Sequence, residues 1–214
     1  MLKNFFTVAM RNIFKHKFYS FLNIFGLTIG ITAALFIVLY LSSELSYDRF
    51  HRNIDRMYKV GLHARMGNQD LSGNFTPYPM AAALSSEIPE ISDAIRLWRW
   101  SDVVIKYGDK SFTEDGIFHA DSNFFRFFTF PLIKGDPNTV LSEPNSIVLS
   151  ESSARKIFGN EDPVGKLLTF SNANKTMKVT GVARNAPDNS HIKFNYIVSF
   201  SSLDQRNNKS GYCC

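Results

Sequence analysis

Residues 21–41 read FLNIFGLTIGITAALFIVLYL, and no charged side chain occurs from Phe18 to Ser43. As an α-helix these 21 residues would be about 31 Å long, which matches the roughly 30 Å hydrocarbon core of a bilayer. Thirteen of them are Leu, Ile, Phe or Val, and each contributes roughly −0.3 to −0.6 kcal/mol to insertion. The summed insertion free energy of these residues outweighs the unfavourable contributions of Asn23, Gly26 and Gly30. We therefore predict a transmembrane helix over residues 18–43.

The flanks of this segment give an orientation. Four basic residues precede it, at positions 3, 11, 15 and 17, and no acidic residue occurs before Glu44. The positive-inside rule then places residues 1–17 in the cytoplasm and residues 44 onward outside. A cleaved signal peptide would have a shorter apolar region and a small-x-small cleavage site, whereas Leu41 to Glu44 match such a site poorly. We therefore expect an uncleaved signal anchor.

The net charge of the chain does not indicate nucleic-acid binding. Lys and Arg number 24 against 19 Asp and Glu, which gives +5 and a pI near 9.2. Four of these five excess charges belong to the 17-residue leader. The basic balance is therefore a mark of membrane topology, and we expect no nucleic-acid partner.

The leader itself has the pattern of an amphipathic helix. Its apolar residues recur at helical spacing, with the polar and basic ones largely elsewhere. Two interpretations stay open, a helix that lies on the lipid surface and a helix that contacts a cytoplasmic partner. Within the membrane segment, Gly26 and Gly30 form a GxxxG pair, which lets two helices approach closely. The apolar residues of the leader pattern are Leu2, Phe5, Phe6, Ala9, Met10 and Ile13.

The residues after the membrane segment keep a helical spacing through Leu45, Phe50 and Ile54. We therefore expect a stalk helix over residues 44–55 that extends out of the membrane. An alternation of apolar and polar residues then begins near Met57 and predicts a strand.

Residues 56–203 predict one α+β domain with a mixed or antiparallel sheet, in two interleaved subdomains, because short helices and strands intermingle. Helices are expected at 79–87, at 151–158 between Ser150 and Gly159, and after a cap at Asp121. Strands are expected at 95–107 and 111–119, joined at Gly108, and in 146–149, 167–170, 177–184 and 192–200. The aromatic run FFRFFTF at 124–130 is expected in the core, with a docking surface as the alternative. Residues 204–214 form a polar tail.

No pattern in the chain supports catalysis or a cofactor. Gly159 to Lys166 resembles a phosphate-binding loop, but five residues separate the glycines and Leu167 stands where Ser or Thr is needed. The five histidines lack the spacing of a zinc site, and no G-x-S-x-G motif occurs. Cys213 and Cys214 cannot form a disulfide framework, and their surroundings do not favour a prenylation tail. We therefore predict no enzyme, no metal and no cofactor.

Several blocks of the chain resemble the permease subunits of the MacB and FtsX-like ABC transporters. The blocks run from about residue 3 to residue 200. They are RNIFKHKFYSFLNIFGLTIG (11–30), ELSYDRFHRNIDRMYKV (44–60), PMAAALSSEIPEISDAIRL (79–97), FFTFPLIKGDPNTVL (127–141), NSIVLSESSARKIFGNEDPVGKLL (145–168) and VTGVARNAPDNSHIKFNYIVSF (179–200).

The resemblance implies a permease of the bacterial inner membrane, with a cytoplasmic N-terminus and a periplasmic main domain. Its partners would be a separate cytoplasmic ATPase, a second permease copy and a periplasmic or outer-membrane protein. ATP-driven closure of the ATPase would be transmitted through the membrane helices to the periplasmic domain, for export or mechanotransmission. The leader residues near the ATPase would be Phe5, Phe6, Met10, Arg11 and Phe14. The stalk residues would be Glu44, Tyr47, Asp48, Phe50 and Ile54.

The chain departs from the family pattern at its C-terminal end. Family permeases have further membrane helices after the periplasmic domain, and no apolar segment of that length follows residue 200. We therefore expect a truncated or fragmentary permease. The alternative is a single-pass periplasmic binding or sensor module without transport activity. No residue pattern identifies a substrate.

Overall fold

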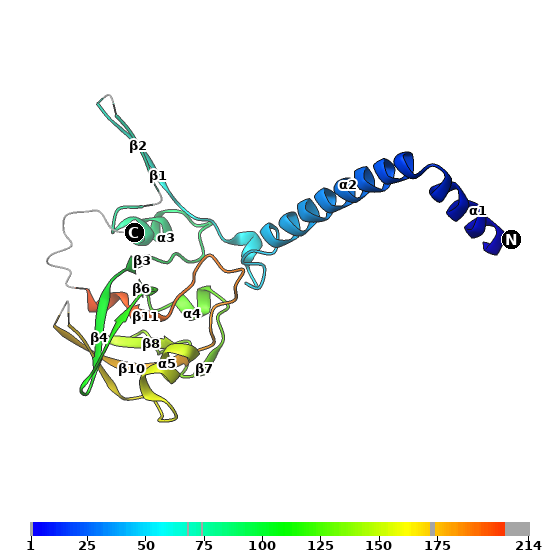
Figure 1. The fold of residues 1–214 in the computed structure, drawn as a ribbon. Coiled ribbons are helices and arrows are strands. Elements are labelled where there is room, and N and C mark those ends of the chain that lie inside the picture. The colour runs from blue at the N-terminus through cyan, green and yellow to red at the C-terminus, as the bar shows by residue number, and fades with distance from the viewer. Residues whose placement is uncertain (1, 68, 74, 172–173, 204–214) are drawn as a thin grey trace. The chain divides into compact units, whose positions relative to one another are not determined.

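The computed structural model describes residues 2–67, 69–73, 75–171 and 174–203 (Figure 1). The chain divides into two compact units, residues 1–47 and residues 48–214. The first unit is helical, and the second holds every strand that the structure describes. Each unit has its own local structure and is described in turn.

Unit 1 consists of two helices, α1 (Leu2–Lys15) and α2 (Lys17–Glu44). They are separated at His16, whose φ of −117° and ψ of 54° are not helical. In the described part of the chain, α2 is the one helix long and apolar enough to cross a membrane, with a mean hydropathy of 2.4 and no buried residue. A continuous helix over residues 18–43 is therefore confirmed, and its place in a membrane stays a prediction.

The expectation of a stalk helix through residue 55 is wrong. Helix α2 ends at Glu44, residues 45–53 form turns, and a single 3-10 turn, η1, covers Ile54–Arg56. The helical spacing of the apolar residues misleads here because Asp48 adopts a positive φ of 55°, a conformation that a helix cannot accommodate. The strand expected from Met57 begins later, at Leu62.

Unit 2 is built on one mixed sheet. In the described residues it has nine strands in the order β3-β6-β11-β8-β10-β9-β4-β5, with β7 paired to β10. The pairs β10–β8 and β11–β6 are parallel and the others antiparallel. One continuous sheet thus carries the whole α+β domain. The strands are β3 (Leu97–Trp100), β4 (Val103–Tyr107), β5 (Lys110–Glu114), β6 (Ile117–Ala120), β7 (Leu132–Lys134), β8 (Ser146–Ser150), β9 (Leu167–Phe170), β10 (Lys175–Ala183) and β11 (Tyr196–Ser199).

The central strands are buried on both faces, which gives the domain two cores. In β8, Ile147 and Leu149 join one core and Val148 joins the other, because successive side chains of a strand point to opposite faces. Helix α5 (Glu151–Phe158) contributes to the first core and α4 (Phe124–Phe127) to the second. The aromatic run supplies Phe124, Phe125 and Phe130 to the second core, so the expectation of core packing is confirmed.

The remaining elements lie between Leu62 and Glu87 and at the end of the described chain. Strands β1 (Leu62–Met66) and β2 (Gln69–Gly73) pair as an antiparallel ribbon that extends away from the main sheet (Figure 1). Helix α3 (Met80–Glu87) matches its prediction. A 3-10 turn, η2 (Phe200–Ser202), follows β11.

Two local predictions have opposite outcomes. Ser150 caps α5 as expected, since its side chain accepts a hydrogen bond from the backbone amide of Ser153. Asp121 does not cap α4, because its carboxylate instead binds the guanidinium of Arg96. The residue at the cap position is Asn123, and its side chain donates to Asp93.

Candidate functional site: the segment that follows the apolar helix

The first residues of unit 2 are fixed to its core by Asp48. The backbone amide of Asp48 donates to the carbonyl of Asn189 at 2.9 Å. Its carboxylate accepts from the backbone amide of His191 at 3.0 Å and lies 2.7 Å from Nδ1 of the same residue. Asp48 thus holds the loop at 189–191 with both its backbone and its side chain.

His51 anchors the same segment inside the domain. Only 3% of its surface is exposed, and its ring lies 5.0 Å from that of Phe130 and 5.3 Å from that of Phe128. Nδ1 accepts a hydrogen bond from the backbone amide of Thr129 at 3.1 Å. Burial lowers the pKa of His51, with the nearby Asp48 carboxylate opposing the shift. The ring is therefore held in the neutral form that can accept this bond.

Further contacts hold the residues next to Asp48 and His51 in place. The backbone amide of Arg52 donates to the Thr129 hydroxyl at 3.0 Å, and that of His51 donates to the Asp48 carbonyl at 3.0 Å. Phe50 packs on Phe130 with ring centroids 5.5 Å apart. We call residues 48–52, with the residues that hold them at 128–130 and 189–191, the anchor.

The anchor includes two of the residues that the sequence assigned to the stalk, Asp48 and Phe50. Glu44 is the last residue of α2, Tyr47 is the last residue of unit 1, and Ile54 is half-buried in η1. Sequence reasoning did not find His51, Thr129 or His191. Their partners lie 78 and 143 positions away along the chain, and no local pattern encodes such pairs.

Helix α1 presents four of the five predicted leader residues together. Phe6, Met10, Arg11 and Phe14 line one shallow surface, together with Thr7. Residues 6, 10 and 14 follow the four-residue spacing of one helix face. Phe6 is 71% exposed and Phe14 64% exposed, so this face is open within unit 1. The side chain of Phe5 lies outside the described part of the chain.

The two glycines of α2 leave one side of that helix open. A Cβ atom added at Gly26 or Gly30 would meet nothing within 4 Å. No residue of α2 is buried. The GxxxG face is thus accessible to another helix.

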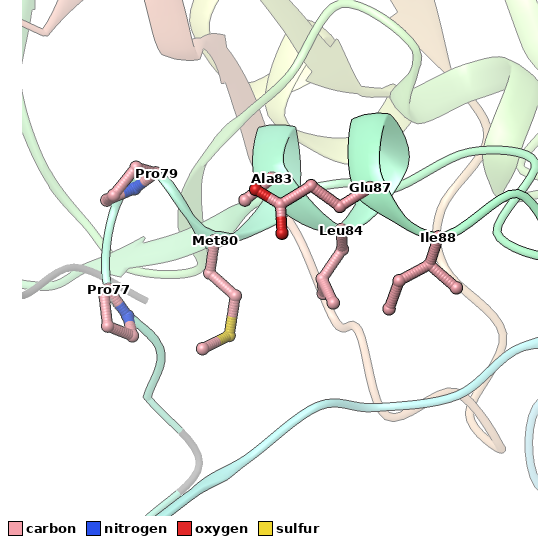
Figure 2. Close-up of a pocket in the computed structure, with 7 residues that line it drawn as sticks. All are labelled: Pro77, Pro79, Met80, Ala83, Leu84, Glu87 and Ile88. Carbon is pink, nitrogen blue, oxygen red and sulfur yellow. The ribbon is translucent and has the colours of Figure 1, made fainter.

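A shallow apolar hollow lies beside α3 (Figure 2). Its volume is about 340 Å³. The side chains of Met80, Leu84 and Ile88 point to the same side, and Glu87 is the one charged residue of the lining. A small-molecule site usually has several converging polar groups, so this hollow has the character of an apolar contact surface.

Two features bear on metal binding and phosphate binding in the described residues. No group of three or more His, Cys, Asp or Glu side chains among them is placed to hold a metal ion. In the segment that resembles a phosphate-binding loop, the amide of Gly165 donates to Val179 and that of Lys166 donates to Pro163. These amides are therefore committed to the fold and do not form a phosphate cradle. Cys213 and Cys214 lie outside the described residues.

Comparisons with known proteins agree with this architecture. A sequence profile described as the MacB-like periplasmic core domain matches residues 20–212. None of the curated protein sequences compared with the chain matches it.

Three solved structures are similar to the chain. A domain of a Porphyromonas gingivalis protein described as a permease is 24% identical, with a TM-score of 0.59, and the match covers 71% of this chain and 64% of that one. The periplasmic region of MacB from Actinobacillus actinomycetemcomitans is 22% identical, with a TM-score of 0.48 and coverage of 64% and 61%. The extracellular domain of the ABC-type transporter YknZ from Gram-positive bacteria is 15% identical, with a TM-score of 0.47 and coverage of 64% and 70%. The chain spans less than two thirds of the first two structures, and the likeness to the first concerns the fold.

Proposed function

Because the chain belongs to the family of MacB-like periplasmic core domains, we propose that it transmits ATP-driven motion from a cytoplasmic ATPase to its periplasmic domain. In this proposal α2 crosses the bacterial inner membrane, with α1 in the cytoplasm and unit 2 in the periplasm. The chain acts as a permease subunit, together with a second permease copy and a periplasmic or outer-membrane partner protein. The ATPase is a separate chain, and this chain has no catalytic role of its own.

The observation that carries the proposal is the anchor. Leu45, Ser46 and Tyr47 are the three residues between the end of α2 and Asp48. Asp48 is hydrogen-bonded to the loop at 189–191 and His51 to Thr129 in the aromatic run, and both partners are distant in the sequence. A short connection that ends in a hydrogen-bonded segment with one buried side chain would pass a displacement into the domain, whereas a long flexible linker would absorb it.

The open face of α1 supports the cytoplasmic half of the proposal. Phe6, Met10 and Phe14 present apolar surface to a partner, and Arg11 beside them adds a donor for a carboxylate or a carbonyl group. An exposed apolar stripe on a helix is the usual form of a helix-in-groove contact. We assign this face, with Phe5, to the ATPase contact.

Co-purification of the full-length parent protein with its ATPase tests the proposal. The variant F6S/M10S/F14S should lose the ATPase, because it removes the apolar stripe. The control V8S replaces one exposed apolar residue of α1 outside the stripe and should retain the ATPase. Retention of the ATPase by the triple variant would exclude this face as the contact. Absence of any ATPase from the unmodified parent would instead favour a single-pass binding or sensor module.

A further inference from the structure

The segment that directly follows α2 is strongly basic on its exposed side. Residues 49–60 contain four exposed cations and one exposed carboxylate, Asp55, so the charge of this range is +3 with the buried His51 left aside. Among the residues that the structure describes, none of the four cationic side chains takes part in an ion pair. These charges therefore do not serve the fold through salt bridges. The four cations are Arg49, Arg52, Arg56 and Lys59.

Membrane topology does not explain these cations either. Four Lys or Arg residues precede α2 or begin it, and four follow within 15 residues of its end. Basic residues close to the translocated end of a span oppose the positive-inside orientation. If unit 2 is periplasmic, as the family match indicates, the four cations act against insertion. Cations that oppose membrane insertion are expected to be kept only where they have another function, such as binding.

The start of the segment lies close to the end of α2. Four peptide steps connect Glu44 to Asp48, and four fully extended steps reach about 14 Å at most. This bound holds for any orientation of the two units. Tyr58, next to Lys59, is 85% exposed, and tyrosine is enriched at the level of lipid head groups.

We propose that residues 49–60 form a binding surface for the phosphate groups of anionic phospholipids in the leaflet that faces unit 2. Arg49, Arg52, Arg56 and Lys59 supply the charge, and Tyr58 supplies an amphipathic ring for the interface. The nearness of the bilayer favours lipid over an acidic protein as the partner. The proposal rests on α2 crossing the membrane and makes no use of the ATPase, so its failure would leave the proposed coupling intact.

Energy transfer in proteoliposomes tests the proposal on the whole chain. A donor dye is attached at N53C in a chain in which Cys213 and Cys214 are replaced by Ser. The bilayer is phosphatidylcholine with a small fraction of acceptor-labelled phosphatidylglycerol or, in parallel, acceptor-labelled phosphatidylcholine. The attraction between one cation and an anionic surface corresponds to about fivefold enrichment of anionic lipid. We therefore expect phosphatidylglycerol near position 53 to be enriched about fivefold or more.

Two variants of equal charge identify the surface. R49Q/R52Q/R56Q/K59Q should reduce transfer from labelled phosphatidylglycerol to the phosphatidylcholine level. The control K106Q/K110Q/K178Q/K193Q removes four exposed lysines from elsewhere in unit 2 and should keep the enrichment. Equal transfer to both lipids in the unmodified chain overturns the proposal, and so does an equal loss in both variants. The unfolding temperatures of the two variants check that both are folded.

A competition experiment separates a lipid surface from a site for soluble anions. Inorganic phosphate and chloride are compared at the same ionic strength, so that general screening is equal. For a lipid surface the two salts should reduce the enrichment alike. Selective loss in phosphate would identify a soluble-anion site and contradict the lipid assignment.

Discussion

The backbone amide of Thr129 donates a hydrogen bond to Nδ1 of His51 at 3.1 Å, across 78 positions of the sequence. This bond joins the first residues of unit 2 to the aromatic segment of its second core. His51 is almost fully buried, so the acceptor side of the bond is shielded from water. The start of the domain is thereby tied to its packed interior, and the transmission that we propose from α2 relies on this contact.

Removing the His51 side chain should destabilise unit 2. H51A leaves a cavity among aromatic rings and the Thr129 amide without its acceptor, and we expect a loss of about 2–4 kcal/mol in the free energy of unfolding. Denaturant unfolding of the full chain in detergent measures it. The control H63A changes an exposed histidine of β1 and should lie within about 0.5 kcal/mol of the parent. A loss in H51A as small as the control's would show that the anchor contributes little to stability.

The stability of unit 2 should fall in acid because of His119. Its ring is 1% exposed and lies 5.3 Å from the ring of Trp98 and 5.4 Å from that of Trp100. Among the described residues neither ring nitrogen has a partner with hydrogen-bond geometry. Burial lowers the pKa from 6.5 to about 4, although the nearby backbone of Ser199 opposes the shift.

The sign of this effect follows from proton linkage. Between pH 6.5 and pH 4 the unfolded chain binds the proton and the folded chain does not, so stability is present above this window and is lost as the pH falls through it. We expect a decrease of about 3 kcal/mol from pH 7 to pH 4 relative to the variant H119F, which cannot titrate. Denaturant unfolding of both proteins at each pH measures the difference. Parallel pH profiles would exclude His119 as the cause.

The ion pair between Arg96 and Asp121 should require arginine, and not lysine, at position 96. Nε of Arg96 lies 3.0 Å from Oδ2 and Nη2 lies 2.6 Å from Oδ1 of Asp121. The guanidinium also lies 4.5 Å from the ring centre of Tyr78 and 4.3 Å from that of Phe200. R96K keeps the charge but loses the two-pronged geometry and the stacking, so we expect a loss of about 1–3 kcal/mol.

Thermal unfolding together with limited proteolysis near residue 78 checks this prediction. Proteolysis should increase there because Tyr78, which leads into α3, loses its contact with the guanidinium. R99K alters an exposed arginine of β3 and should change neither result. Equal behaviour of R96K and R99K would mean that charge alone suffices at position 96.

The Gly26 and Gly30 face of α2 should mediate contact between two copies of the chain. The variant G26I/G30I blocks close approach of two helices, and a Cβ atom at either position meets nothing within 4 Å in its own chain. We expect about tenfold weaker self-association in bilayers, as expected for the loss of about 1–2 kcal/mol of helix packing. Energy transfer between two labelled populations measures it. The control I24L keeps the glycines, and a reduction of the same size in that variant would contradict the assignment.

The sequence alone determined the elements that depend on local composition. The 21 residues at 21–41, most of them apolar, decide the long helix, because insertion is a sum over residues and needs no partner within the chain. Ser150 and Gly159 likewise fix the ends of α5, since a cap acts on neighbouring backbone. The aromatic run at 124–130 was correctly expected in the core, because so much apolar surface is rarely left in water.

Only the tertiary structure decided how the chain continues after α2. The spacing of Leu45, Phe50 and Ile54 predicted a helix, but the contacts of Asp48 with the loop at 189–191 and of His51 with Thr129 favour a turn. Asp121 similarly faces Arg96, which is 25 positions away in the sequence. These side chains choose partners by proximity in the folded domain, and a local pattern carries no information on which distant groups the sheet will bring near.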